Sequence, residues 1–256
     1  MTKSLPSLFL SHGAPTLPLE EGATPAFLRA LGQNLPRPEA ILIVSAHWEA
    51  AEPSIGMAER PETIHDFYGF PDALYRLRYP AHGSRELGER ATALLAEGGL
   101  TPQAVADQGL DHGAWVPLLL MYPEADIPVV QLSLMRGQGA THHHEIGRLL
   151  APLREEGVLL VGSGGAVHNL RALSHSDRPA PWAQAFEDWL VDSVTGDCRD
   201  ELLAWQDRGD ARQAQPTDEH FLPLFFSMGA GQGAGRLLHR GFTYGSLSMA
   251  AFAWDH

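Results

Sequence analysis

Histidine is unusually common in this chain, at 13 of 256 residues. That is roughly twice the share expected from average composition. Histidine is the commonest metal ligand, and it is the only side chain whose unperturbed pKa lies near neutrality. A cluster of histidines could therefore bind a metal ion or transfer protons. The question is which histidines the fold brings to one place.

Three histidines follow predicted strands. Apolar, β-branched runs typical of buried strands lie at residues 7–13, 40–48 and 158–165. A histidine lies at or just beyond the end of each run, namely His12, His47 and His168. Ligands of α/β sheets bind just beyond the carboxyl ends of the strands. We therefore predict that these three histidines share a site at one edge of a sheet.

Two further histidines precede predicted apolar helices. His112 stands in an Asp-His-Gly motif, where it could carry a proton near a helix N-terminus, although Asp111 and Gly113 also suit a simple cap or turn. His220 follows Glu219 in an acidic turn, and either side chain could supply a third metal ligand.

Other histidines and their neighbours have plainer interpretations. The run His142, His143, His144 lies on a predicted helix, where consecutive side chains point in different directions and cannot share one metal, so we expect these three at the surface. Glu49 shares a strand face with His47 and could orient it, but exposure to water is favoured. Residues 63–71, rich in aromatics and glycine, suit a substrate-facing loop or a packed Ω loop equally.

The glycine-rich segment 162–165 fits no known catalytic loop. Val167 breaks the dinucleotide-binding pattern, and Val161 replaces the first glycine of a nucleophile elbow. We therefore predict that Ser163 is not a nucleophile. The small residues would instead let a ligand or another backbone segment come close.

Strands alternate with helices along the chain. Another buried strand is predicted at 127–134, and a strand-like tail at 242–254. Helices are predicted at residues 25–32, 84–99, 115–122, 141–157, 181–194, 199–206 and 221–231. No linker or repeat interrupts this pattern. It predicts one α/β domain over residues 1–256, with a mostly parallel or mixed central sheet flanked by helices on both faces.

Charge and composition exclude several classes of protein. The net charge of −13 argues against nucleic acids and anionic membranes as partners. The single cysteine, Cys198, excludes an intramolecular disulfide and a thiolate-rich metal site. No apolar run is long enough to span a membrane, and the first residues do not form a signal peptide. We expect a soluble cytoplasmic protein, as a monomer or small homo-oligomer.

Six motifs in order resemble the DODA-type family of extradiol ring-cleaving dioxygenases, which belongs to the superfamily of the protocatechuate 4,5-dioxygenase catalytic subunit. The resemblance extends from residue 7 to about residue 254. The motifs are SHGAP, SAHWE, TIHDFYGFP, GLDHGAW, GSGGAVHNLR and PTDEHFLPL. Each motif alone is weak, and their shared order is specific.

The resemblance implies one mononuclear non-haem metal. His12, His47 and His220 match the metal ligands of the family, and Glu219 remains an alternative to His220 because some members of the superfamily use a glutamate. His168 matches an acid/base histidine and a possible fourth ligand of zinc. His112 matches a histidine beside the oxygen and substrate site.

The implied reaction inserts both atoms of O₂ into a DOPA-like or other catechol and yields a ring-opened semialdehyde. Fe²⁺ with open positions suits this chemistry, and Zn²⁺ is plausible in the purified protein, although it is redox-inert. Two alternatives are a zinc-dependent hydrolase and a non-catalytic metal-binding scaffold of the same superfamily. A hydrolase would act with Zn²⁺ and without O₂, whereas a scaffold would not bind catechol.

Overall fold

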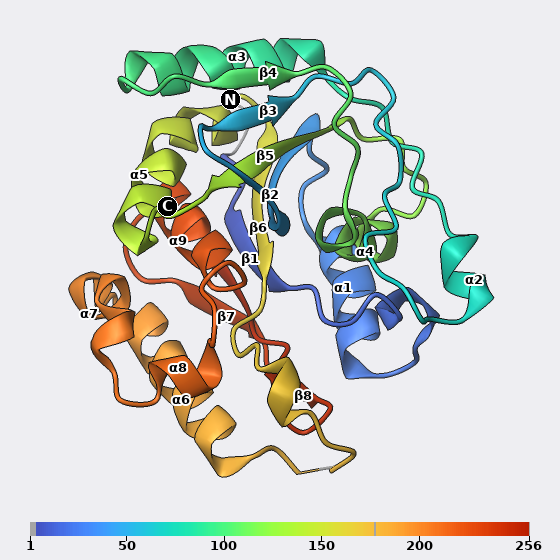
Figure 1. Ribbon diagram of the computed structural model, residues 1–256. Coiled ribbons are helices and arrows are strands. Elements are labelled where there is room, and N and C mark those ends of the chain that lie inside the picture. Colours follow the sequence, from blue (N-terminus) through green and yellow to red (C-terminus); the bar gives the residue numbers. More distant parts are fainter. Residues whose placement is uncertain (1–3, 177, 256) are drawn as a thin grey trace.

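A mixed eight-stranded sheet forms the centre of the protein in a computed structural model that describes residues 4–176 and 178–255 (Figure 1). The strand order is β4-β3-β5-β2-β6-β1-β10-β7. The strands are β1 (Ser7–Ser11), β2 (Ala40–Ala50), β3 (Ser54–Gly56), β4 (Gln103–Val105), β5 (Val129–Met135), β6 (Val158–Gly164), β7 (Arg236–His239) and β10 (Ala251–Trp254).

The four central strands are parallel and the flanking strands add antiparallel pairs. Strand β2 pairs in parallel with β5 and β6, and β6 pairs in parallel with β1. Strands β3 and β10 join this core in antiparallel fashion, against β5 and β1. The predicted α/β fold with a mixed sheet is confirmed. Because β1, β2 and β6 are neighbours, their carboxyl ends meet at one edge.

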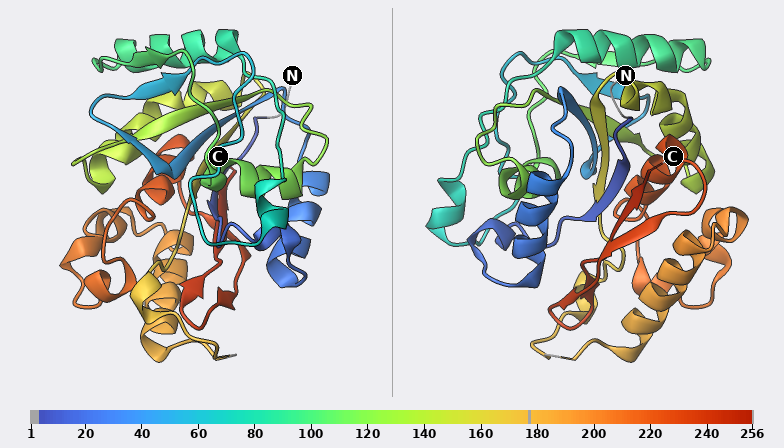
Figure 2. Two further views of the ribbon diagram at one scale, coloured as in Figure 1. Left: turned by 45° about the vertical axis from the view of Figure 1, so that its right-hand side comes forward. Right: turned by 180° about the vertical axis from the view of Figure 1, so that it is seen from behind.

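Helices cover both faces of the sheet (Figure 2). On one face lie α1 (Ala23–Asn34) and α4 (His112–Met121), and on the other lie α5 (Ala140–Leu150) and α9 (Leu222–Ala230). Side chains of a strand alternate between the two faces of the sheet. Ile41 and Ile43 of β2 pack on the face covered by α1 and α4, and Leu42 and Val44 pack on the face covered by α5 and α9. This burial on both faces explains why the central strands read as continuous apolar runs.

The remaining elements complete the fold. They are α2 (Asp72–Tyr75), α3 (Arg85–Glu97), α6 (Pro181–Thr195), α7 (Arg199–Leu203), α8 (Ala211–Ala214), the hairpin β8 (Phe242–Thr243) with β9 (Leu247–Ser248), and 3₁₀ turns at Leu17–Leu19, Ala151–Arg154, Leu170–Ala172 and Trp205–Asp207. Among the described residues, no helix has the length and apolar character needed to cross a bilayer.

Several predicted boundaries were wrong. Helix α4 begins at His112, capped by the side chain of Asp111, and not at residue 115, so that Pro117 lies inside the helix. Helix α5 begins at Ala140 after Gly139 and ends at Leu150, and not at residue 157. The strand-like tail is a hairpin followed by β10. The short strands β3, β4 and β7 were not predicted, because three or four residues carry too little periodicity to be detected.

The expectation that the three consecutive histidines lie at the surface was wrong for His143. Its ring is 1% exposed, whereas His142 and His144 are half-buried. Nδ1 of His143 lies 2.9 Å from the carbonyl of Gly139, and Nε2 accepts a hydrogen bond from the backbone N–H of Met135 at 3.0 Å. The ring is therefore a neutral link between α5 and the end of β5. Burial lowers the pKa of His143 from 6.5 to about 4.

His143 should make the stability of the protein depend on pH. Unfolding exposes a histidine that binds a proton near pH 6.5, whereas the folded form resists protonation until about pH 4. The contribution of His143 to the free energy of unfolding is therefore fully present above pH 6.5. It falls by about 3 kcal/mol as the pH drops from 6.5 towards 4. We expect His143→Gln to lose less unfolding free energy over this range than the wild type in urea titrations of metal-free protein. The exposed control His82→Gln should keep the wild-type slope, and equal slopes for all three proteins would contradict the assignment.

Candidate metal centre

Two histidines meet where β1 and β2 end. His12 follows β1 directly, at the level where Ser11 pairs with Gly164 of β6. His47 lies in β2 where its pairing with β5 shifts register between Val44 and Glu49, and such irregularities re-aim side chains. The two Nε2 atoms lie 3.1 Å apart. The strand ends alone therefore bring two imidazoles into contact.

A hydrogen-bond chain sets the tautomer of His12. Pro117 has no N–H to bond the carbonyl of Gly113 one turn earlier, and the hydroxyl of Ser163 donates to that carbonyl instead. Having given its only hydrogen away, the Ser163 oxygen accepts from Nδ1 of His12 at 3.1 Å. The lone pair of His12 is consequently on Nε2, facing His47.

His220 reaches the same place from the turn before α9. The glycines of β6 allow this approach, because a Cβ at Gly164 would lie 2.1 Å from the carbonyl oxygen of His220. The backbone N–H of Gly165 donates to that same carbonyl. Nδ1 of His220 lies 3.0 Å from the carboxylate of Glu219, which leaves Nε2 free. The prediction that small residues here admit another backbone segment is thus confirmed.

The three imidazoles suit a divalent metal ion. Ligand atoms of His12, His47 and His220 all lie within 4.8 Å of one another. Nitrogens bound to one metal at about 2.1 Å are roughly 3.0–3.4 Å apart at angles near 90–110°, which the 3.1 Å between His12 and His47 matches. Burial and the neighbouring histidines lower the pKa of His12, and they lower that of His47 to about 2. Both rings are therefore held neutral, as metal ligands must be.

Glu219 takes a different place from His220. Its carboxylate accepts hydrogen bonds from Nδ1 of His220 and from the hydroxyl of Thr217. Although burial acts in the opposite direction, these hydrogen bonds and the contact with His220 lower the pKa of Glu219 to about 2. Glu219 also forms a possible metal group with His168 and His220. Its contact with His220 has the geometry of a carboxylate that orients a ligand histidine.

His168 lies against His220. The two rings are parallel, with an interplanar angle of 8° and centroids 3.5 Å apart. Burial and His220 lower the pKa of His168 to about 3. His168 lies in a loop ahead of the 3₁₀ turn Leu170–Ala172. Within the described residues, no hydrogen bond engages its ring nitrogens, so they remain available to a ligand.

His112 is held by an acid that sequence analysis missed. The carboxylate of Asp66 accepts from the backbone N–H of His112 at 3.0 Å and lies 2.9 Å from its Nδ1. Burial opposes ionisation, but these hydrogen bonds keep the pKa of Asp66 below its usual value. Asp66 also lies 3.7 Å from Nδ1 of His47. The signal for Asp66 in the sequence is its position beside His65 in the motif TIHDFYGFP.

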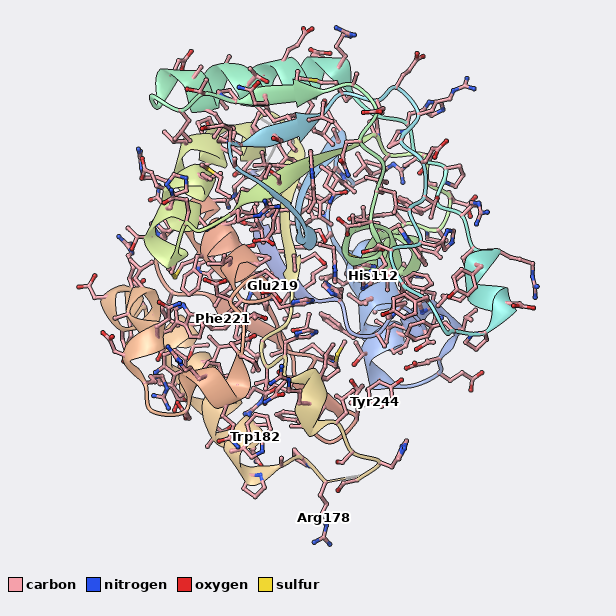
Figure 3. The ribbon with its side chains drawn as sticks, in the orientation of Figure 1. His112, Arg178, Trp182, Glu219, Phe221 and Tyr244 are labelled. Atoms are coloured by element: carbon pink, nitrogen blue, oxygen red, sulfur yellow. The ribbon has the colours of Figure 1, made fainter. Side chains whose placement is uncertain are left out.

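The histidines form the floor of a cavity of about 460 Å³, which is within the range for small-molecule sites. His12, His47, His112, His168 and His220 all line it. In Figure 3, Glu219 and His112 lie on either side of the site, and Tyr244 lies below both. The fold thus brings together all five histidines selected from the sequence.

The structure places three further features that the sequence analysis considered. Glu49 is exposed, as favoured, and does not orient His47. The segment at 63–71 is a loop that contributes Asp66 to the site and Phe70 to the cavity wall. Ser163 is fully buried, with its hydroxyl between Gly113 and His12. That Ser163 is not a nucleophile stays a prediction, which labelling with a fluorophosphonate can test.

Residues 6–253 match the family described as the catalytic LigB subunit of aromatic ring-opening dioxygenase. The chain is 44% identical over 252 residues to the 4,5-DOPA dioxygenase extradiol of Escherichia coli (strain K12), covering 96% of this chain and 93% of that protein. It is 41% identical over 254 residues to the protein of the same name from Beta vulgaris, covering 96% and 95%.

The fold has a solved counterpart. The crystal structure of an uncharacterized protein from Escherichia coli K12 superposes with a TM-score of 0.84 at 37% sequence identity. The match covers 98% of this chain and 99% of the other. The likeness therefore includes the sheet and the loops that carry the histidines.

Proposed function

Because this chain belongs to the family of the catalytic LigB subunit of aromatic ring-opening dioxygenases, we propose that it opens catechol rings at a metal ion held by His12, His47 and His220. It is an extradiol dioxygenase, which cleaves the ring beside the two hydroxyls and places both atoms of O₂ in the product. The convergence of three imidazoles on the floor of the cavity carries the proposal of the ligand set.

We propose Fe²⁺ as the active metal. When bound, it would supply open positions for the catechol oxygens and O₂ and would carry electron density between them. The protein supplies the orientation of the ligands: Ser163 holds Nδ1 of His12, and Glu219 holds Nδ1 of His220. Both contacts leave Nε2 of each ring facing the common centre. Metal-binding histidines usually have their other ring nitrogen held by a hydrogen bond in this way.

We assign proton transfer to His168. A neutral ring on the cavity wall can accept a proton from a catechol hydroxyl and return it during ring opening. His112, held by Asp66 through Nδ1–H, has its lone pair on Nε2 and lines the cavity, where Nε2 can accept a hydrogen bond from a bound reactant. Asp66 is a positioning residue, because it contacts His112 and not the cavity.

Replacing Asp66 by asparagine should slow ring opening. The amide keeps the size of the side chain but loses the charge-assisted hydrogen bond that fixes the tautomer of His112. We expect activity per bound metal to fall roughly 10- to 100-fold, with metal content unchanged. Oxygen uptake measured beside metal analysis tests this. Asp72→Asn, an exposed acid of the same loop region, is the matched control, and an unchanged rate in Asp66→Asn would refute the positioning role.

The substrate suggested by the relatives is DOPA, since both carry that name. The test is anaerobic loading with Fe²⁺, followed by oxygen uptake over a panel of catechols that includes DOPA. We expect one O₂ consumed per catechol and a yellow ring-opened product. Hydrolysis with Zn²⁺ in the absence of O₂ would point to a hydrolase instead, and failure to bind any catechol would point to a scaffold.

A further inference from the structure

Asp111 carries a buried carboxylate that the proposed function does not use. The residue is 3% exposed. Its Oδ1 accepts the hydroxyl of Ser45 at 2.6 Å and the backbone N–H of Ala114 at 3.1 Å, and its Oδ2 accepts from Nε2 of Gln131. The contact with Ala114 caps α4. A cap needs only one oxygen, which serine or asparagine supplies equally well, so the cap alone does not explain a carboxylate at this position.

The hydrogen bonds around Asp111 indicate that it is ionised. The oxygen of Ser45 accepts the backbone N–H of His47 at 3.2 Å, and the one hydrogen of this hydroxyl goes to Asp111. Ala114 and Gln131 present further hydrogens, so both carboxylate oxygens act as acceptors. Burial raises the pKa of Asp111, because it removes the charge from water, and the hydrogen bonds from Ser45 and Gln131 act in the opposite direction.

No side chain of the described part of the chain forms an ion pair with Asp111. The nearby histidines His47 and His112 have Asp66 as their acidic partner instead. Neutral donors and the N-terminus of α4, where the helix dipole favours a negative charge, hold the carboxylate of Asp111. A buried ion without a counter-charge destabilises a fold, so a group that brings a positive charge to this region would be bound more tightly.

The carboxylate of Asp111 lies beside a proposed metal ligand. Ser45 links it to the backbone of His47. A Cβ at Gly113 would lie 3.0 Å from Cδ2 of His47 and 3.2 Å from Oδ1 of Asp111, so the imidazole and the carboxylate border the same small space. A cation held by His47 would bring a positive charge to this buried region. Buried charges attract each other more strongly than exposed ones, because water and salt screen them less.

We propose that Asp111 is a positioning residue of the metal centre, and that its buried charge strengthens the binding of a divalent cation by His12, His47 and His220. This inference rests on the proposed function, because it assumes that ligand set. The carboxylate also joins the end of β2 to the first turn of α4, and it thereby fixes the chain segments that carry His47 and His112.

Asp111→Asn separates the charge from the cap. The amide keeps the size of the side chain and the capping oxygen. Oε1 of Gln131 has no hydrogen-bond partner among the described residues, so this amide can turn over to accept from the new NH₂ group. We expect the metal-free variant to melt within about 2 °C of the wild type or above it, because an unpaired buried charge is removed. Co²⁺, added as the probe in calorimetry, should bind roughly 10- to 100-fold more weakly.

Two variants are matched controls. Ser84→Ala removes the hydroxyl that caps α3, a helix with no residue in the cavity, and should lower the melting temperature by about 2–4 °C without changing the Co²⁺ affinity. Asp107→Asn removes the same charge from an exposed position in the loop before α4 and should change neither quantity. Should Asp111→Asn fail to fold, Ser45→Ala breaks the same link and should weaken Co²⁺ binding roughly fivefold.

The Co²⁺ affinity decides the outcome. A dissociation constant equal to that of the wild type in folded Asp111→Asn, or in Ser45→Ala where it replaces that variant, would overturn the proposal. A lower melting temperature with unchanged affinity would likewise leave Asp111 as a helix cap alone. An equal loss of affinity in Asp107→Asn would also overturn it, because the effect would then belong to the overall charge. The proposed function fails on separate evidence, namely Co²⁺ binding that His12→Ala does not reduce, or wild-type protein that consumes no O₂ with Fe²⁺ and any catechol.

Discussion

His12→Ala should lose the metal ion and ring-opening activity together. His12 is 2% exposed, and its Nε2 lies 3.1 Å from Nε2 of His47, so its removal takes away one of three converging ligands. Two histidine ligands hold a divalent ion weakly. The ion loses bound water when it enters the site, and two metal–nitrogen bonds compensate for that loss less well than three. We expect metal content near background after gel filtration, and oxygen uptake equal to that of metal-free protein.

A histidine that lies outside the site controls for the substitution itself. His82→Ala removes an exposed imidazole and should retain full metal content and activity. Melting curves of both variants show whether the fold survives. Should folded His12→Ala retain stoichiometric metal, the assignment of His12 as a ligand would be wrong, and the groups with Asp66 or Glu219 would be the next candidates.

His168→Ala should separate chemistry from metal binding. The ring lines the cavity and stacks on His220, yet its nitrogens are not part of the group formed by His12, His47 and His220. The variant should therefore hold Fe²⁺ and bind catechol. Ring opening should fall roughly 10²- to 10⁴-fold, the usual contribution of a positioned general acid or base. The measurement is turnover per bound iron, taken beside a melting curve.

The alternative roles of His168 give different results. His175→Ala, an exposed histidine of the same loop segment, is the matched control and should behave as the wild type. A purely structural role predicts a less stable variant with normal turnover per folded molecule. Loss of metal, as in His12→Ala, would make His168 a ligand, and the acid/base role would then pass to His112.

Local sequence was enough to predict the central sheet and three of the converging histidines. The central strands are buried on both faces, so their composition alone marks them. His12, His47 and His168 follow from strand position, because parallel neighbours end at the same edge. His112 and His220 were selected as candidates from their motifs, and the resemblance to a family supplied the roles of all five histidines.

Only the tertiary structure revealed the contacts that orient these histidines. The hydrogen bonds that link Gly113 through Ser163 to His12 join residues 50 and 151 positions apart, and no local pattern predicts such a link. Asp66 reaches His112 across 46 positions, and His143 is buried because α5 packs onto the end of β5. The spacing of apolar residues along the chain shows which face of a helix or strand is buried, because residues on one face recur at a fixed interval in the sequence. Which side chains then meet depends on how the elements pack, and only the folded chain determines that.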